Sequence, residues 1–527
     1  GNNAIGGAVL MLTTLPAPVQ NIKNRIVRGP VPTLSVSKTK IKGNRKGIFA
    51  SYYNRYLDDF GNHFLRKANE SIKLVNCEIS HNQEEAVYVL SPHWNIWSSN
   101  ISEISIHINN TLITDNGRGI LQYSRDMRQS NNLFHWILQD SSIERNQGSG
   151  FDVSLPYVWQ YNENFTHSLY FGNNTWRDNE NFAFIVDGHY AGFNMSFNRF
   201  VGNRCKEGLI SIRGMEKRMK IDNNNIERNT GSFMVEFKAD SQSEILGEIP
   251  ATFYYNEIRQ NSNGLVSRGI HQMFHKPTYV VGFQGIQKVA VNRNLFGDNS
   301  MDYELVAGIR TAKINNEVDV TENWWGTHDE LEIKKSIFDF DDWNNHAVAN
   351  FRPYLTSDSF ESSISASWAL KPAIDLDNLG GRITENLSIY YRSTPYVIKS
   401  DITIMPDTTV NIYPDVVMEF APNVGILVLG TLKAVGAPGH EIVMRPMVKS
   451  EMENSVAKRA AEQQTIRFCK DGKCSSSFNE GFIEFFNRTT LQWIPLCDRR
   501  FTERNAQVAC RQMGYDPLNV FVSHGRR

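Results

Sequence analysis

The chain has 527 residues, of which 41% are hydrophobic and 21% charged, and its formal net charge is -1. This composition is that of a globular chain with roughly two to four domains. The balanced charge gives no global reason to expect nucleic acid or an anionic membrane surface as a partner. No run of residues approaches the roughly 18 apolar residues that cross a bilayer.

A repeat runs through the first 300 positions: an apolar residue is followed three places later by Asn. Two of its copies, "IERNQGS" from Ile143 and "IERNTGS" from Ile226, are nearly identical. A drifting interval within roughly 20 to 50 residues is typical of a solenoid with variable loops. The stations are Ile41/Asn44, Ile79/Asn82, Ile113/Asn116, Ile143/Asn146, Trp176/Asn179, Phe200/Asn203, Ile226/Asn229, Ile258/Asn261 and Phe296/Asn299.

The local chemistry of the repeat indicates β-structure. β-Branched and aromatic residues alternate with polar ones, as in "EISIHI" from Glu103, and no 3.6-residue stripe is sustained. Asn tolerates left-handed backbone geometry at corners, and stacked amides can form a ladder. We therefore predict an all-β fold, a right-handed parallel β-helix with one coil per station and the apolar station residue pointing inward. A β-sandwich with Asn-rich loops is the alternative.

The stretch "VDVTENWWGTHDELEIKKSIFDFDDWNNHAVANFRPYL", Val318 to Leu355, resembles the closing segment of right-handed parallel β-helix proteins. The resemblance implies that Trp324 and Trp325 cover the open end of the core. The first domain is thus expected at 1–355, with a cap at its C-terminal end.

Three further segments follow. Residues 356–385 are rich in Ser and Asp and are interpreted as a linker. Residues 386–446 alternate strictly and resemble the opening coils of a second β-helix, with Pro406, Pro414 and Pro422 expected at corners. Residues 447–464 are charged and are expected to be an exposed tether.

The last segment, 465–527, resembles the scavenger receptor cysteine-rich domain, a small α+β module. A strand leading to a Trp, a Cys-Asp pair and an Ala-x-hydrophobic-x-Cys-Arg-Gln helix carries the resemblance. The domain is expected to be incomplete, because the motif covers only about 60 of roughly a hundred residues. The matching residues are Gly481, Ile483, Glu484, Phe485, Trp493, Cys497, Asp498, Ala506, Val508, Cys510, Arg511, Gln512, Met513, Gly514 and Tyr515.

Four of the six cysteines lie in this last segment, which indicates a disulfide module and an oxidising compartment. The resemblance implies that Cys497 and Cys510 bond to partners beyond Arg527. Cys469 and Cys474 are a candidate pair, although spacing alone leaves their connectivity open. The isolated Cys77 and Cys205 are expected to be buried thiols.

Some members of the scavenger receptor cysteine-rich family hold a divalent cation beside a Cys-Asp-Asp sequence. Here the sequence is Cys497, Asp498, Arg499, and a guanidinium replaces one oxygen ligand. We therefore predict no metal site at this position.

Candidate N-glycosylation sites fit a secreted protein without proving one. The Asn-x-Ser/Thr sequons begin at Asn69, Asn100, Asn109, Asn164, Asn173, Asn194, Asn386 and Asn487.

The order of modules resembles the arthropod bark beetle family, also called Anakonda. The resemblance implies that the chain is a fragment of the ectodomain of a single-pass membrane protein at tricellular septate junctions. The signal peptide and membrane anchor would then lie outside the fragment. It also implies partners among extracellular or junctional proteins, including a copy of the protein on an adjacent cell, with glycans as further candidates.

A carbohydrate-active enzyme is an alternative to this function. A carbohydrate-active β-helix enzyme would need clustered carboxylates. The best cluster, Asp339, Asp341 and Asp342 in the cap, is interpreted as a solvated turn. No spacing forces Asp178, Asp187 and Asp222 together, and the 13 histidines show no metal-ligand spacing. We predict no catalytic, metal or cofactor-binding residues.

A scavenger-type ligand-binding receptor remains a further alternative. Aromatic residues in the long loops are candidate contacts, although packing against neighbouring coils is the favoured interpretation. They are Trp94, Trp97, Tyr157, Trp159 and Tyr161.

Overall fold

In the computed structural model, the regular secondary structure of the described residues is almost all β-strand, and the chain forms two compact units, residues 1–443 and 444–527. The structure describes residues 9–12, 33–51, 66–91, 102–124, 132–156, 166–188, 191–213, 218–238, 251–263, 277–284, 289–308, 317–365, 374–421, 423–447, 466–470, 473–475, 482–487 and 492–495.

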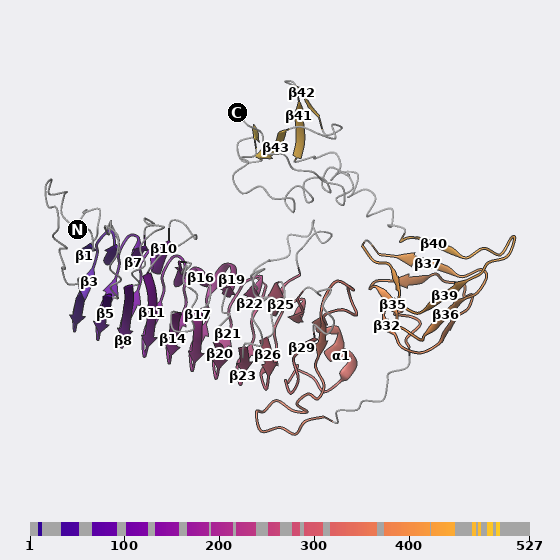
Figure 1. Cartoon of the computed structure of the whole chain (residues 1–527), viewed down its shortest axis with the longest axis horizontal. Helices are drawn as coiled ribbons and strands as arrows, with labels where there is room; N and C mark the ends of the chain where they lie inside the picture. Colours follow the sequence, from indigo (N-terminus) through magenta and orange to yellow (C-terminus); the bar gives the residue numbers. More distant parts are fainter. Residues whose placement is uncertain are drawn as a thin grey trace, which may run out of the picture. The chain divides into compact units, whose positions relative to one another are not determined.

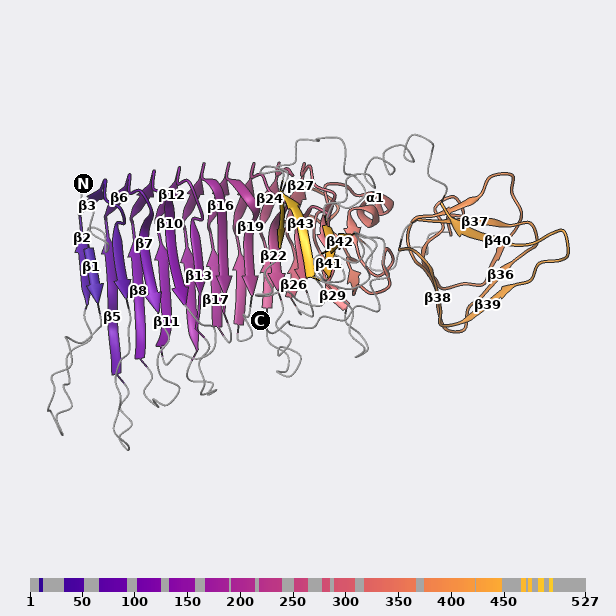
Figure 2. The same cartoon turned by 90° about the horizontal axis from the view of Figure 1, so that it is seen from above.

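Three parallel sheets form the first solenoid, and each turn of the chain adds one strand to each of them (Figures 1 and 2). Sheet A contains β1 (Val9–Leu12), β4 (Ile48–Ser51), β7 (Glu85–Ser91), β10 (Arg118–Ser124), β13 (Phe151–Ser154), β16 (Glu180–Asp187), β19 (Arg204–Arg213), β22 (Phe233–Lys238), β25 (Tyr279–Gln284), β28 (Tyr303–Val306) and β30 (Ile337–Phe338). Sheet B contains β2 (Leu34–Ser37), β5 (Arg66–Val75), β8 (Ser102–Asn109), β11 (Asn132–Gln139), β14 (His167–Gly172), β17 (Ala191–Ser196), β20 (Arg218–Asp222), β23 (Ala251–Tyr254) and β26 (Val289–Asn292). Sheet C contains β3 (Lys40–Lys42), β6 (Glu78–Ser80), β9 (Leu112–Thr114), β12 (Ser142–Glu144), β15 (Thr175–Arg177), β18 (Arg199–Val201), β21 (Asn225–Glu227), β24 (Glu257–Arg259) and β27 (Leu295–Gly297).

The apolar residue of each repeat station occupies the central position of a sheet C strand. Ile143, for example, lies in register between Ile113 and Trp176, and all three side chains are fully buried. Each station therefore marks one coil, and the prediction of a parallel β-helix is confirmed.

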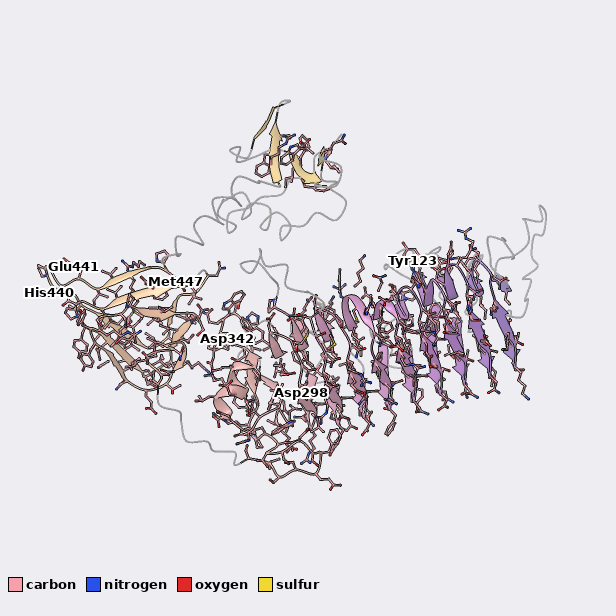
Figure 3. The ribbon with its side chains drawn as sticks, turned by 180° about the vertical axis from the view of Figure 1, so that it is seen from behind. Tyr123, Asp298, Asp342, His440, Glu441 and Met447 are labelled. Carbon is pink, nitrogen blue, oxygen red and sulfur yellow. The ribbon has the colours of Figure 1, made fainter. Side chains whose placement is uncertain are left out.

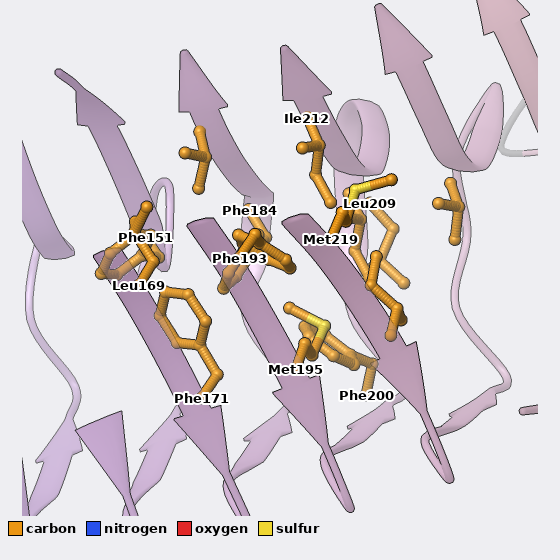
Figure 4. Packing of buried hydrophobic residues seen from close by; sticks show 14 of the residues in the cluster. Phe151, Leu169, Phe171, Phe184, Phe193, Met195, Phe200, Leu209, Ile212 and Met219 are labelled. Atoms are coloured by element: carbon orange, nitrogen blue, oxygen red, sulfur yellow. The ribbon is translucent and has the colours of Figure 1, made fainter. Parts of the chain in front are cut away.

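Aromatic side chains fill the core in the middle of the solenoid (Figure 4). Phe151 packs edge-on against Phe171 with ring centroids 4.9 Å apart, and Trp176 stacks on Phe200 of the next coil at 5.6 Å. Such pairs contribute about 0.5–1.5 kcal/mol each beyond the burial of their area. Consecutive coils are thus joined by side-chain stacking as well as by backbone hydrogen bonds.

A ladder of buried Asn amides closes the corner between sheets C and A. From Asn116 onward the amide oxygen of each rung accepts two hydrogen bonds from the preceding coil. Asn146 Oδ1, for example, accepts from Asn116 N at 3.0 Å and from Asn116 Nδ2 at 3.1 Å. Asn146 Nδ2 donates to Asn179 Oδ1 at 3.0 Å and to Ile113 O at 3.1 Å. Every polar atom of the buried side chain is satisfied by a neighbouring coil.

The left-handed residue at this corner is not the ladder Asn, as the sequence had indicated, but the residue before it. Asp115, Arg145 and Asp178 have φ of 56°, 50° and 54°. The following Asn is held instead by the four hydrogen bonds of its buried amide, which explains why Asn recurs there.

A second ladder, which the repeat analysis missed, closes the corner between sheets B and C. It passes from Asn174 to Asn198 and Asn224 through amide bonds of 2.9 and 3.0 Å. In the first coils, Thr111 and Ser141 hydroxyls accept the corresponding backbone N–H bonds. The missed signal was a second Asn, five residues before the Asn of each station from Asn174 onward. The ladder continues through Asn256, Asn294 and Asn323.

The cap lies at the end of the first solenoid. It comprises α1 (Glu330–Lys335), with Asp329 as its N-cap, and the pair β29 (Glu317–Asp319) and β31 (Val348–Asn350). Trp325 stacks on Phe296 at 5.1 Å and is 3% exposed, so it covers the core as expected. Trp324 is only half-buried, because adjacent residues of an extended strand point to opposite sides. The prediction that both tryptophans cover the core is therefore wrong for Trp324.

The second solenoid has three sheets and its own buried core. Its first strand (Gly381–Ile383) and the buried Leu379 lie within residues 356–385, so the predicted boundary between linker and solenoid at 386 is too late. Pro406 and Pro414 lie at corners and precede the left-handed Asp407 and Asp415, whereas Pro422 lies outside the described residues. The strands are β32 (Gly381–Ile383), β35 (Ile402–Ile404) and β38 (Ile426–Val428); β33 (Leu387–Ile389), β36 (Thr409–Ile412) and β39 (Thr431–Ala434); and β34 (Tyr396–Ile398), β37 (Val417–Phe420) and β40 (Val443–Pro446).

The C-terminal unit contains an antiparallel sheet of β41 (Ile466–Lys470), β42 (Lys473–Ser475), β43 (Phe482–Asn487) and β44 (Gln492–Pro495). Arg467 Nε and Nη2 donate to Glu484 at 2.9 and 2.7 Å, and its guanidinium lies 4.1 Å from the centre of the Trp493 ring. The motif residues Glu484 and Trp493 thus contact the same arginine. The predicted helix and, apart from Met447, the segment expected as a tether lie outside the described residues.

Replacing Asn146 by Ala is expected to lower the free energy of unfolding by about 3 kcal/mol, because buried donors and acceptors of two coils lose their partners. Urea denaturation measures the change. Gln147→Ala is the matched control: Gln147 is exposed in the next position, and its truncation should cost less than about 0.5 kcal/mol. Equal losses in the two variants would contradict a stabilising ladder.

Candidate functional site

The acidic cluster of the cap is buried, not a solvated turn as the sequence had indicated. Asp339 and Asp341 are 7% and 8% exposed. The Asp339 carboxylate accepts hydrogen bonds from the backbone N–H groups of Asp341 and Ala349, both at 2.9 Å. The turn is covered because the second solenoid contacts it through Arg382, which the sequence pattern did not reveal.

Asp341 binds the first strand of the second solenoid. Arg382 Nε and Nη2 donate to the Asp341 carboxylate at 2.7 and 3.1 Å, and Lys334 Nζ lies 3.3 Å from it. Burial raises the pKa of Asp341, but the hydrogen bonds and charges of Arg382 and Lys334 outweigh burial, so its pKa lies below the ordinary value. This carboxylate stays ionised and engaged.

Asp342 and Asp401 complete what we call the polar joint, the set Asp341, Asp342, Arg382 and Asp401. Asp401 donates its backbone N–H to Asp342 O at 2.9 Å, and its carboxylate accepts from Asn344 N at 3.0 Å and Gly425 N at 2.7 Å. Burial raises the pKa of Asp342 to about 7. The cluster joins the cap to the second solenoid, and its oxygens are occupied by groups of the chain itself.

Asp178, Asp187 and Asp222 do not converge. Asp178 is exposed at the corner after sheet C, Asp187 ends a strand of sheet A, and Asp222 ends a strand of sheet B and accepts a hydrogen bond from Ser196 Oγ. The three carboxylates therefore belong to different faces.

Asp187 has another carboxylate neighbour that sequence reasoning missed. Burial raises the pKa of Asp152, and although Arg118 opposes this, the charge of Asp187 raises the pKa further. Arg213 Nη1 lies 3.7 Å from Asp187. Both carboxylates lie on the outer face of sheet A, on the neighbouring strands β13 and β16. Asp187 is displaced from Asp152 by two residues in the register of these strands. A signal was available, since both stand at outward positions of neighbouring coils.

No group of three His, Cys, Asp or Glu side chains within the described residues could hold a metal ion. The buried His167 has a structural role: its Nδ1 accepts from Phe134 N at 3.0 Å, and Nε2 lies 2.8 Å from Pro156 O. In the same described ranges, no helix combines the length and apolar character required to cross a membrane.

The cysteines divide as follows. Cys77 is a buried free thiol, while Cys205 is a half-buried free thiol whose pKa is raised by burial. Cys469 is disulfide-bonded and lies directly opposite Cys474 in the β41/β42 ladder. The bond between these two residues, and those of Cys497 and Cys510, which lie outside the described residues, stay predictions.

The sequons differ in their surroundings, and their occupancy stays a prediction. Asn173 and Asn386 are exposed, and Asn109 and Asn194 are half-buried. Asn69 and Asn487 lie on β5 and β43, and Asn100 and Asn164 lie outside the described residues. The loop aromatics Trp94, Trp97, Tyr157, Trp159 and Tyr161 also lie outside them.

Two surface aromatics that the sequence analysis missed, Tyr254 and Tyr255, lie at the end of β23. They border a shallow groove of about 580 Å³ on sheet B, together with Lys220, Arg293 and Glu322. The available signal was Tyr255 itself, which stands before a ladder Asn where most earlier coils have Asn or Asp. This groove is the candidate binding site.

Replacing Asp342 by Asn is expected to raise the free energy of unfolding at pH 8 by about 2 kcal/mol more than at pH 5. The carboxyl of Asp342 has an ordinary pKa of 3.8 and a folded pKa of about 7. The folded state therefore binds the proton more tightly, and its stability falls as pH rises between these values. Urea denaturation at the two pH values measures the difference.

The contrasting variant is Asp341→Asn, since the pKa of Asp341 is lowered in the folded state. This variant should lower the free energy of unfolding at neutral pH. The ionised Asp341 of the unchanged protein stabilises the fold above pH 3.8 and loses this effect as pH falls below about 3.8, so the difference between the two proteins should shrink there. A pH-independent effect of Asp342→Asn would contradict the raised pKa.

Comparison with known proteins gives two matches. The model of the scavenger receptor cysteine-rich domain matches residues 473–526. Protein bark beetle of Drosophila melanogaster is 50% identical over 560 aligned residues, which cover 100% of this chain and 18% of the relative. No solved structure matches the chain. The resemblance to the bark beetle family is therefore confirmed along the whole chain, and its C-terminal module is a scavenger receptor cysteine-rich domain.

Proposed function

We propose that the chain is part of an extracellular, non-catalytic adhesion or scaffold protein of epithelial tricellular junctions. The observation that carries the proposal is the 50% identity to protein bark beetle along the whole chain. Membership of that family implies a junctional role on the extracellular side of a membrane protein. The scavenger receptor cysteine-rich domain and the disulfide of Cys469 suit an oxidising, extracellular setting.

The architecture supports a scaffold. Coils that contact only their neighbours build a long surface whose outward residues can change without changing the core. Repeated modules on one chain bind several partners at high effective concentration. The described carboxylates of the polar joint are engaged by Arg382 and backbone N–H groups, which supports a structural role for them.

Two alternatives remain in view, a scavenger-type receptor and a carbohydrate-active enzyme. One observation favours the enzyme: the Asp152 carboxyl has a raised pKa beside the Asp187 carboxylate. Such a pair can divide into an acid and a base. Arg213 beside Asp187 and Arg118 beside Asp152 suit an ion-pair network equally well.

A chimera tests the junction role. The segment of Drosophila bark beetle that aligns with this chain is replaced by this chain in epithelium lacking the endogenous protein. We expect the chimera to accumulate where three cells meet and to restore those contacts, because the segment shares half its residues. A protein with the segment deleted is the control. A chimera that reaches the cell surface but spreads evenly along all cell borders would count against the proposal.

An assay for polysaccharide cleavage tests the non-catalytic role. The purified chain, incubated with pectin, alginate and β-1,4-linked glycans, should release neither reducing ends nor unsaturated products. The same measurement on Asp152→Asn identifies the source of any activity. Cleavage that disappears in this variant would establish the enzyme alternative.

A further inference from the structure

The groove on sheet B crosses consecutive coils. Lys220, Thr252 and Tyr254 come from β20 and β23, while Arg293 and Glu322 come from the next two corners. In register, Lys220 lies opposite Thr252, and Tyr254 lies between Asp222 and Asn292. The groove therefore runs along the solenoid axis and presents one set of side chains per coil.

A row of left-handed residues follows this corner from coil to coil, and three of its members, Tyr255, Arg293 and Glu322, line the groove. The row, which we call the corner row, consists of the residues directly before the second Asn ladder: Phe197, Asn223, Tyr255, Arg293 and Glu322. Phe197 and Tyr255 have φ of 58° and 55°, in a region that suits Asn and is costly for bulky side chains. The described residues place no other Phe or Tyr at positive φ. Earlier coils have Asn76, Asn110, Asp140 and Asn173 at the same corner.

The aromatic side chains of this region differ in exposure, and Tyr254 and Tyr255 are half-buried. Phe197 is 61% exposed. The rings of Tyr254 and Tyr255 lie 5.4 Å apart, and Phe360 packs against Tyr255 at 5.7 Å. Arg259 Nη1 fixes the Phe360 turn by donating to Asp358 at 2.6 Å. Tyr255 is therefore held in place on one side by the turn.

The charges of the groove cancel locally. Lys220 Nζ lies 3.4 Å from Asp222, and Arg293 Nε donates to Glu322 at 2.7 Å. The groove thus combines aromatic surfaces with hydroxyl, ammonium and guanidinium donors but has no excess charge. Such a lining suits an uncharged ligand with many hydroxyl groups, whose ring faces are apolar and whose edges are polar.

The spacing of the row matches a polymer of sugars. Adjacent strands lie about 4.8 Å apart, so the row repeats at this interval. One pyranose ring extends a β-linked glycan by a similar length. We propose that the groove and corner row bind an extended, uncharged β-linked glycan, with Phe197 and Tyr255 as stacking platforms. This inference goes beyond the proposed junctional role and does not depend on it.

Calorimetric titration of the full chain with hexamers of β-1,4-linked N-acetylglucosamine and of β-1,4-linked glucose tests the inference. At least one hexamer should bind, and Tyr255→Asn and Phe197→Asn should each weaken binding by roughly tenfold, the loss expected for one aromatic contact. Asn restores the residue type that earlier coils use at this corner, so the urea midpoint should stay unchanged or rise.

Tyr123→Asn is the matched control, because Tyr123 is 48% exposed on β10 of sheet A (Figure 3). It should leave binding unchanged. The inference is overturned if neither hexamer binds, if binding survives both corner-row substitutions, or if the only glycan bound is a polyanionic heparin fragment. Failure of the junction chimera would leave this result unaffected, so the two proposals fail independently.

Discussion

Buried amide groups at the corners are the constraint on which the first solenoid depends. A parallel β-helix turns its backbone three times per coil, and each turn threatens to leave polar groups inside without partners. Asn solves this at two corners because one side chain supplies a donor and an acceptor to the coils on both sides. These hydrogen bonds resemble the Asn ladders that form between stacked strands of separate chains, but here they join coils of one chain.

This solution separates the positions that build the fold from those that can vary. The sheet C residue and the two ladder residues point inward and are held by neighbours. The residue before each rung of the second ladder points outward from a left-handed corner, and it is Asp140 in one coil and Tyr255 in another. Chemistry can therefore change there from coil to coil while the backbone stays the same.

The sequence predicted the features that repeat. Stations such as Ile143/Asn146 revealed the coils because each carries the same inward residue and the same ladder amide. The second ladder was missed because its first rungs are Thr111 and Ser141, which obscure the Asn pattern. The sequence placed the left-handed position at the ladder Asn, one residue too late. Asn suits both a left-handed corner and an amide ladder, so its recurrence alone does not separate the two roles.

Features that depend on a single distant contact could not be predicted. Asp341 lies in a short acidic turn, and only the fold brings Arg382, 41 positions later, against it. The groove likewise depends on which side chains of separate coils share a face, such as Lys220 and Thr252. Repetition reveals the register of coils, but it does not show which nonrepeated side chains gather on the surface.

The direction of the ladders determines how the solenoid responds to mechanical load. Both amide ladders and the backbone bonds run from coil to coil, along the direction in which coils stack. An end coil is held by the bonds of one interface, whereas an inner coil is held on both sides. Coils would therefore detach one at a time from an end, and the aromatic stack of Trp176 and Phe200 would resist in the middle. Under a pulling force, the solenoid would therefore lengthen in steps of one coil.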